Sequence, residues 1–97
     1  MNATKNFYII SYDLKKTHQE YPKLYETIKS FQYWRHPLSS TWVIYTNNSA
    51  NEISNRLRTE GEMDDNDLLF VCRLEIQDRQ GWLDKKFWEW IKSVPMV

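Results

Sequence analysis

Four short runs rich in aromatic and β-branched residues set the strongest limit on what this chain can fold into. They cover residues 7–12, 33–38, 41–46 and 68–74. Runs of this length and composition are typical of β-strands. The second run contains Pro37, which cannot donate a hydrogen bond to a sheet, so this strand is expected at an edge or a bulge. The chain therefore predicts a four-stranded sheet.

Segments with helical periodicity lie between and after these runs. Pro22 suits the first turn of a helix, and apolar residues recur after it at helical spacing. A second helix is predicted after Ser49, because Ser49 and Glu52 fit a capping box, and Gly61 ends it. A third helix is predicted near the C-terminus, where a further apolar stripe stops before Pro95.

The predicted order is β-α-β-β-α-β with an added helix, which places the chain in the α+β class. Two split β-α-β units produce a ferredoxin-like βαββαβ sandwich. Its antiparallel four-stranded sheet carries two helices on one face, and the C-terminal helix is additional. No internal repeat or change in composition marks a second domain. We therefore expect one ferredoxin-like domain over residues 1–97.

The predicted strands are apolar on both sides. In the first strand, Phe7 and Ile9 alternate with Tyr8 and Ile10, whereas a sheet with helices on one face should alternate apolar and polar residues. Leaving a large apolar side chain in water forgoes about 1.5–3 kcal/mol. The C-terminal helix or a second copy of the chain must therefore cover the second face. We expect a homodimer, because one short helix is too small to cover four strands.

Cysteine content and hydropathy indicate a compartment. The single cysteine, Cys72, excludes an intrachain disulfide and lies in an apolar run, where we expect it to be buried. The first six residues are polar and lack the apolar core of a signal peptide, and no run is long enough to cross a bilayer. A cytoplasmic protein with no membrane partner is the expectation.

Charge limits how the chain can contact nucleic acid. Thirteen basic and thirteen acidic residues give a net charge of zero, which excludes a protein that coats nucleic acid through bulk electrostatics. A local patch formed by Lys15, Lys16, His18 and Lys23 either grips a nucleic-acid backbone or is simply solvated. The acidic run within residues 60–67 lacks the glycine and terminal glutamate of a calcium loop and is expected to be solvated.

Polar residues near strand ends are the candidates for chemistry. Asp13 either accepts hydrogen bonds within a turn or, with Asp13 of a second copy, binds a divalent cation. His36 is a candidate general acid or base, and Arg35 a candidate phosphate clamp. Ser40 and Thr41 are suited to bond phosphate oxygens. The alternative is a β-hairpin with ordinary turn hydroxyls and an exposed histidine.

Three segments carry a resemblance to a known group of proteins. They are residues 8–14 (YIISYDL), the helix that begins at Tyr21-Pro22, and residues 34–44 (WRHPLSSTWVI). Over residues 7–75 the chain resembles small bacterial proteins of the SinR family. Those proteins are similar to CRISPR-associated protein 2 and to VapD-type toxins.

The resemblance implies a ferredoxin-like homodimer. In CRISPR-associated protein 2 the aspartate that ends the first strand meets its mate near the dimer axis and is linked to divalent metal, and it corresponds to Asp13 here. Some members are metal-dependent nucleases, others are architectural, and VapD-like relatives resemble ribonuclease toxins. The implied function is a dimeric nucleic-acid-processing protein of a toxin or antiviral defence system, with Mg²⁺ as cofactor and RNA favoured over DNA.

The alternative is a non-catalytic dimer that binds nucleic acid or a protein partner. If the protein is a metal-dependent nuclease, the candidate catalytic residues are Asp13, His36 and Ser40, and Asp13 is also the metal ligand. The candidate nucleic-acid contacts are Tyr12, Lys15, Lys16, Arg35 and Thr41.

Overall fold

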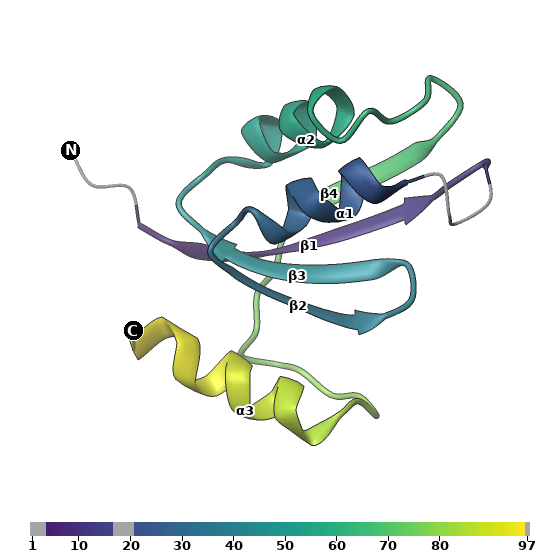
Figure 1. Cartoon of the computed structure of the whole chain (residues 1–97). Coiled ribbons are helices and arrows are strands. Elements are labelled where there is room, and N and C mark those ends of the chain that lie inside the picture. Colours follow the sequence, from purple (N-terminus) through teal and green to yellow (C-terminus); the bar gives the residue numbers. More distant parts are fainter. Residues whose placement is uncertain (1–3, 17–20, 97) are drawn as a thin grey trace.

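The computed structural model describes residues 4–16 and 21–96, and it shows an α+β chain with one sheet and three α-helices (Figure 1). In chain order the elements are β1 (Asn6–Asp13), α1 (Pro22–Lys29), β2 (Tyr33–Leu38), β3 (Thr41–Thr46), α2 (Ala50–Thr59), β4 (Leu68–Arg73), α3 (Lys85–Ser93) and the 3₁₀ turn η2 (Val94–Met96). The predicted class and the predicted order of elements are confirmed. No helix in the described ranges is long and apolar enough to span a membrane.

The four strands form one antiparallel sheet in the order β2-β3-β1-β4. The edge strands are therefore β2 and β4, and β1 lies between β3 and β4. Pro37 lies in edge strand β2, within a register shift between Arg35 and Leu38. The prediction that this proline marks an edge or a bulge is confirmed, because a central strand needs the hydrogen-bond donor that proline lacks.

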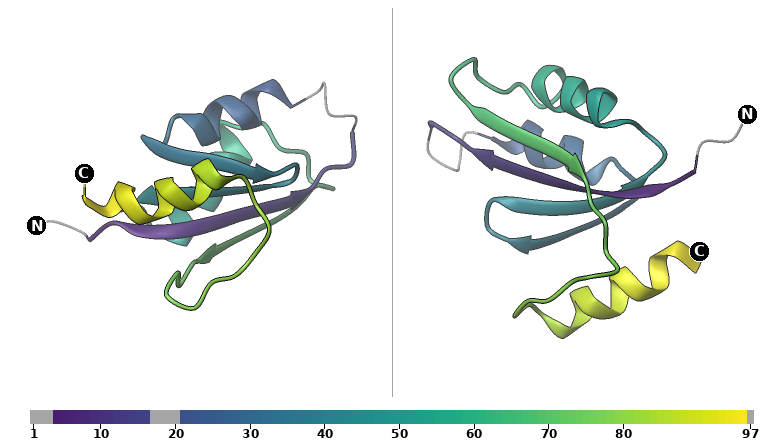
Figure 2. Two further views of the ribbon diagram at one scale, coloured as in Figure 1. Left: turned by 90° about the horizontal axis from the view of Figure 1, so that it is seen from below. Right: turned by 180° about the vertical axis from the view of Figure 1, so that it is seen from behind.

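Helices α1 and α2 lie on one side of the sheet and α3 lies on the other (Figure 2). We call these sides the α1/α2 face and the α3 face. The core of the α1/α2 face is made of aromatic and aliphatic side chains from β1, β3 and both helices. Its fully buried members are Ile10, Leu24, Ile28, Trp42, Ile44, Ile53 and Leu57.

Local chemistry explains where α2 begins. The Glu52 backbone N–H donates to Ser49 Oγ at 3.1 Å, and the Ser49 N–H donates to Glu52 Oε1 at 2.8 Å. This reciprocal pair satisfies two N–H groups that have no partner at a helix start. The predicted capping box is therefore confirmed.

Helix α3 covers only part of its face. It packs Phe87, Trp90 and Ile91 against Phe7 of β1 and Val43 of β3. The strand residues of this second cluster come from β1, β2 and β3, so β4 stays outside it. The α3 face is therefore closed at one side of the sheet and open along β4.

The exposure of β4 on the α3 face contradicts one prediction from the sequence. Leu68 and Phe70 of β4 are 58% and 61% exposed, and Cys72 on the same side of the strand is also exposed. Cys72 was expected to be buried, and that prediction was wrong. The apolar composition of β4 is real, but nothing in the described part of the chain covers this side of it.

Candidate functional site

Asp13 lies at the open part of the α3 face. It ends β1, and side chains alternate along a strand, so it shares a face with Ile9 and Ser11. Its partner on β4 is Leu68. The Asp13 carboxylate is 69% exposed and lies 3.6 Å from the Lys15 ammonium, which is an exposed ion pair of small energetic value. An accessible carboxylate therefore borders an uncovered apolar strand.

A hollow of about 500 Å³ opens beside Asp13. It brings together the end of β1, the segment that follows it, and the turn between β2 and β3. The Tyr12 backbone N–H donates to the Ser40 carbonyl at 3.2 Å and ties two of these segments together. The residues that line the hollow are Tyr12, Asp13, Leu14, Lys16, Tyr25, Ser39 and Ser40. Four of the eight predicted site residues therefore meet here.

The segment after β1 is held in place by Asp67, a residue just before β4. Asp67 is only 3% exposed, and its Oδ1 accepts hydrogen bonds from the Lys15 N–H at 2.9 Å and the Tyr21 hydroxyl at 2.7 Å. Its Oδ2 accepts from the Asp64 N–H at 2.8 Å. Burial alone would raise the pKa of Asp67, but these donors outweigh burial and lower it. Asp67 therefore fixes the backbone next to Asp13.

The expectation that the whole acidic run is solvated was wrong for Asp67. The backbone folds onto this carboxylate from a segment that lies 52 positions earlier, which no local pattern reveals. The sequence signal for the burial of Asp67 was its position. Asp67 directly precedes the apolar run of β4, where the chain enters the sheet.

Trp42 engages two of the predicted site residues. It is 1% exposed, and its Nε1 donates to the Tyr12 hydroxyl at 2.9 Å. Burial raises the pKa of Tyr12 to about 12. The exposed His36 ring stacks on the Trp42 ring at a centroid distance of 3.7 Å, and His36 Nε2 lies 3.1 Å from the Ser39 carbonyl oxygen. His36 is exposed, as in the alternative of an ordinary β-hairpin, and it does not line the hollow beside Asp13.

Arg35 and Thr41 lie on the α3 face. The Arg35 guanidinium lies 5.0 Å from the centre of the Trp90 ring on α3, and its Nη1 donates to the carbonyl of Trp34. Thr41 Oγ1 lies 3.3 Å from Ser11 Oγ on the neighbouring strand. Arg35 is therefore separated from the hollow, whereas Thr41 lies one residue from it in the chain.

The predicted basic loop is partly described. The Lys16 ammonium pairs with the Asp64 carboxylate at 3.2 Å, and the Lys16 N–H donates to the Tyr21 hydroxyl at 3.2 Å. His18 of the predicted cluster lies outside the described residues. Both Lys15 and Lys16 are thus paired with nearby acids in one copy of the chain.

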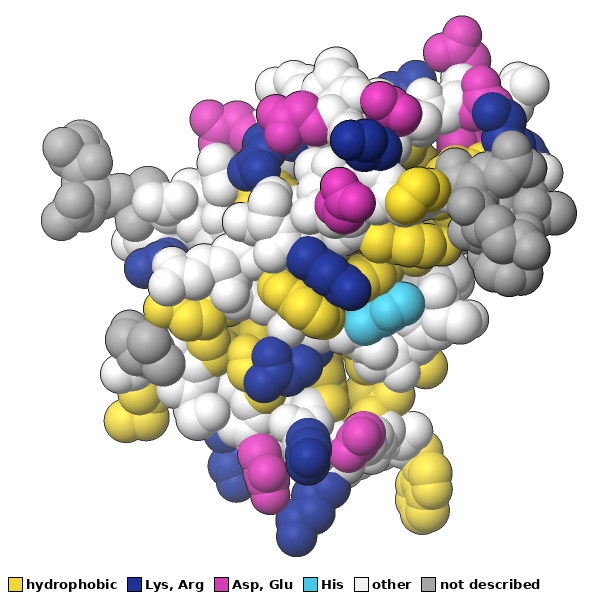
Figure 3. All heavy atoms as spheres, viewed as in Figure 1, with side chains coloured by type: hydrophobic (Ala, Val, Ile, Leu, Met, Phe, Trp, Pro, Cys, Tyr) yellow, Lys and Arg dark blue, Asp and Glu magenta, His cyan; other side chains and the backbone are white. Residues whose placement is uncertain are grey.

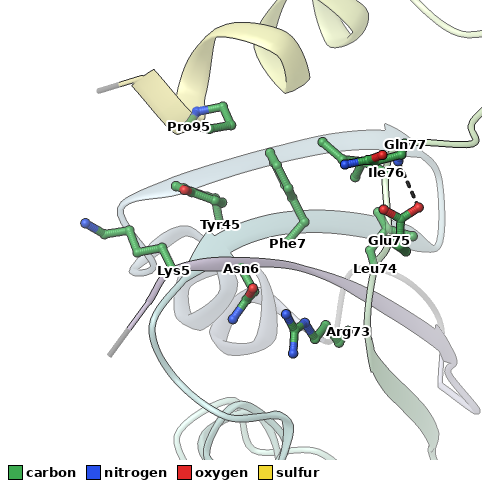
Figure 4. Close-up of a pocket in the computed structure, with 10 residues that line it drawn as sticks. All are labelled: Lys5, Asn6, Phe7, Tyr45, Arg73, Leu74, Glu75, Ile76, Gln77 and Pro95. Atoms are coloured by element: carbon green, nitrogen blue, oxygen red, sulfur yellow. Dashed lines mark hydrogen bonds between the residues drawn. The ribbon is translucent and has the colours of Figure 1, made fainter. Parts of the chain in front are cut away.

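A second hollow of about 490 Å³ lies at the other end of β1 (Figure 4). It is lined by Lys5, Asn6, Phe7, Tyr45, Arg73, Leu74, Glu75, Ile76, Gln77 and Pro95. In Figure 4 its two cations, Lys5 and Arg73, lie apart from each other, and Glu75 Oε1 accepts a hydrogen bond from the Gln77 N–H. None of the predicted site residues lines it, and its polar groups do not converge.

The hollow beside Asp13 is therefore the candidate site. Within residues 4–16 and 21–96, no group of three or more histidine, cysteine or acidic side chains is placed to hold a metal ion. No known protein family, characterised protein or solved structure matches the chain. The site is thus defined by its own chemistry, which is one exposed carboxylate with a lysine and serine hydroxyls nearby.

Proposed function

We propose that the protein is a homodimeric, metal-dependent nuclease of ferredoxin-like topology, similar in action to CRISPR-associated protein 2. The observation that carries the proposal is the position of Asp13 at the edge of the uncovered α3 face. The strand order β2-β3-β1-β4, with α1 and α2 on one face, supports the ferredoxin-like topology.

The uncovered strand supplies a reason to dimerise. Leu68 and Phe70 are each more than half exposed, and burying a large apolar side chain yields about 1.5–3 kcal/mol. In a two-fold dimer the same patch meets itself. Because Leu68 pairs with Asp13, a two-fold axis that passes next to Leu68 would bring the two Asp13 carboxylates together. Paired carboxylates favour a shared proton or a divalent cation.

Mg²⁺ bound by both Asp13 carboxylates would polarise a phosphodiester and activate a water molecule. Ser40 and Lys16 line the same hollow, where the Ser40 hydroxyl can bond phosphate oxygens and the Lys16 ammonium can do so in exchange for Asp64. A net charge of zero disfavours binding along a long stretch of duplex, because such binding depends on many phosphates neutralised by basic side chains. A short single strand is therefore the proposed substrate, and RNA is favoured over DNA because of the resemblance to VapD-type toxins.

Cleavage of mixed RNA and DNA substrates, with Mg²⁺ and with EDTA, tests the proposal. The wild type should cleave RNA only with Mg²⁺, and Asp13→Asn should lose cleavage while keeping the molecular mass of a dimer. Asp65→Asn is the matched control, because Asp65 is an exposed carboxylate on the loop before β4 and should keep wild-type activity. Cleavage by Asp13→Asn at the wild-type rate would rule out this mechanism.

A non-catalytic binding dimer is the second candidate. It is favoured by the ion pair of Asp13 with Lys15, because this pair engages the carboxylate that the nuclease needs for its metal. Acidic and basic side chains are interspersed on the face shown in Figure 3. In a nucleic-acid-binding dimer, Lys15→Glu with Lys16→Glu should weaken binding and flatten its salt dependence. Binding of a protein partner that ignores salt would favour a protein-interaction role instead.

A further inference from the structure

Trp82 is an exception among the tryptophans of the chain. It lies between β4 and α3 and is 100% exposed, whereas Trp42 and Trp90 are nearly fully buried. An indole ring is a large apolar group that usually dominates packing in a core or an interface. A completely solvated indole ring is therefore a candidate anchor only if an apolar groove lies within its reach.

A groove of about 220 Å³ runs between α3 and the sheet, next to this segment. Ligand pockets for drug-sized molecules span roughly 300–1,000 Å³, so this groove is closer to the size of one large side chain. Leu38 at the groove is 54% exposed, so the groove is open to solvent. Its apolar walls include Ile9, Val43, Leu83, Phe87, Trp88 and Ile91.

We propose that Trp82 of one copy inserts into this groove of a second copy, and that the second copy does the same in return. This inference rests on the homodimer of the proposed function, and it identifies Trp82 as the side chain that holds the two copies together. Leu83, the next residue in the chain, already lines the groove of its own copy, while Trp82 stays fully exposed. A reciprocal exchange closes the assembly at two copies.

The groove is continuous with the uncovered face. Ile9 lines the groove and lies on the same side of β1 as Asp13, and Thr41 of the groove wall lies 3.3 Å from Ser11 through their hydroxyls. Aromatic side chains bury about 150–250 Å² each, so Trp82 with the exposed Phe70, Leu68 and Leu38 offers roughly half of the ~800 Å² per partner typical of stable interfaces. The groove walls and the β4 backbone supply further area.

Sedimentation equilibrium provides the first test. Trp82→Ala should raise the dimer dissociation constant about 30-fold or more, because buried aromatic anchors are binding hot spots. Met96→Ala is the matched control, because Met96 is 86% exposed but lies outside the groove lining, and its dissociation constant should equal that of the wild type.

Mixed disulfides provide the second test. In a Cys72→Ser background, one preparation carries Trp82→Cys and the other Leu38→Cys, so each chain has a single thiol and cannot form an internal bond. On mixing under mild oxidation, disulfides between the two variants should exceed the statistical fraction. The pair Met96→Cys with Leu38→Cys should show no such excess.

The outcomes separate the two proposals. A dimeric wild type whose dissociation constant does not change in Trp82→Ala, and which shows no excess of mixed disulfide, overturns the Trp82 anchor and leaves the Asp13 proposal intact. A wild type that is monomeric at micromolar concentration overturns both. Excess mixed disulfide together with normal cleavage by Asp13→Asn supports the anchor and rejects the nuclease.

Discussion

The two faces of the sheet are formed by the same strands, but their side chains are buried to different extents. On the α1/α2 face two helices close a core that contains six fully buried aliphatic side chains. On the α3 face one helix closes a smaller cluster and leaves Leu68 and Phe70 in water. Apolar composition on both sides of a strand therefore does not mean burial on both sides. One face is closed by its helices, and the other keeps large apolar side chains of β4 in water.

Neighbouring isoleucines of β1 give the sharpest test of this comparison. Ile10 is 0% exposed on the α1/α2 face, so Ile10→Ala should cost about 2–5 kcal/mol of unfolding free energy. Ile9 is only partly buried on the α3 face, and Ile9→Ala should cost about 1 kcal/mol. Urea titration measures both values. Equal losses would mean that the two faces contribute alike.

Asp67→Asn should cost about 1–3 kcal/mol, because an amide cannot accept from all three donors that hold the carboxylate. The pKa of Asp67 is lowered from its ordinary value of 3.8. The charged form therefore contributes stability above pH 3.8, and that stability is lost as pH falls through the folded-state pKa. Acid titration of wild type and Asp67→Asn should show a shallower loss in the variant.

Asp84→Ala should loosen the α3 face without altering the other. Asp84 caps α3 by accepting from the Lys86 N–H at 3.0 Å, and loss of such a cap costs about 1 kcal/mol. Amide hydrogen exchange should accelerate in α3 while protection in α2 stays unchanged at low denaturant. Equal acceleration in both helices would show that the two faces unfold as one unit.

Phe70→Ser should have the smallest effect on the single chain. Phe70 is 61% exposed, and surface substitutions change unfolding free energy by about 0.5 kcal/mol or less. Chemical unfolding below the dimer dissociation constant measures this value, and sedimentation should show weaker association. A large loss of stability in the isolated chain would mean that β4 is packed on both sides.

The elements of the fold were predictable because their signals are local. Aromatic and β-branched runs marked each strand to within a residue or two, and Ser49 with Glu52 marked the start of α2. The exposure of Cys72 was not predictable, and the burial of Asp67 was signalled only by its position directly before β4. They depend on how far α3 reaches and on backbone donors from a distant segment, and neither leaves a pattern in the nearby sequence.

The candidate site was predictable in part for the same reason. Asp13 ends β1 and Ser40 directly precedes β3, so both could be placed near strand ends from the sequence. The structure brings both to one hollow. His36 and Arg35 were grouped with them by sequence proximity. In the sheet, alternation along β2 sends Arg35 to Trp90 and His36 to Trp42, away from the hollow.

The link between Lys15 and Asp67 also sets an order of events during synthesis. It spans 52 positions, and contacts of such separation close late because of the entropy of the intervening loop. A chain that has emerged from the ribosome only as far as α2 holds Asp13 on a strand whose following backbone has no fixed course. The backbone beside Asp13 therefore takes its final course only after β4 has been made and has docked.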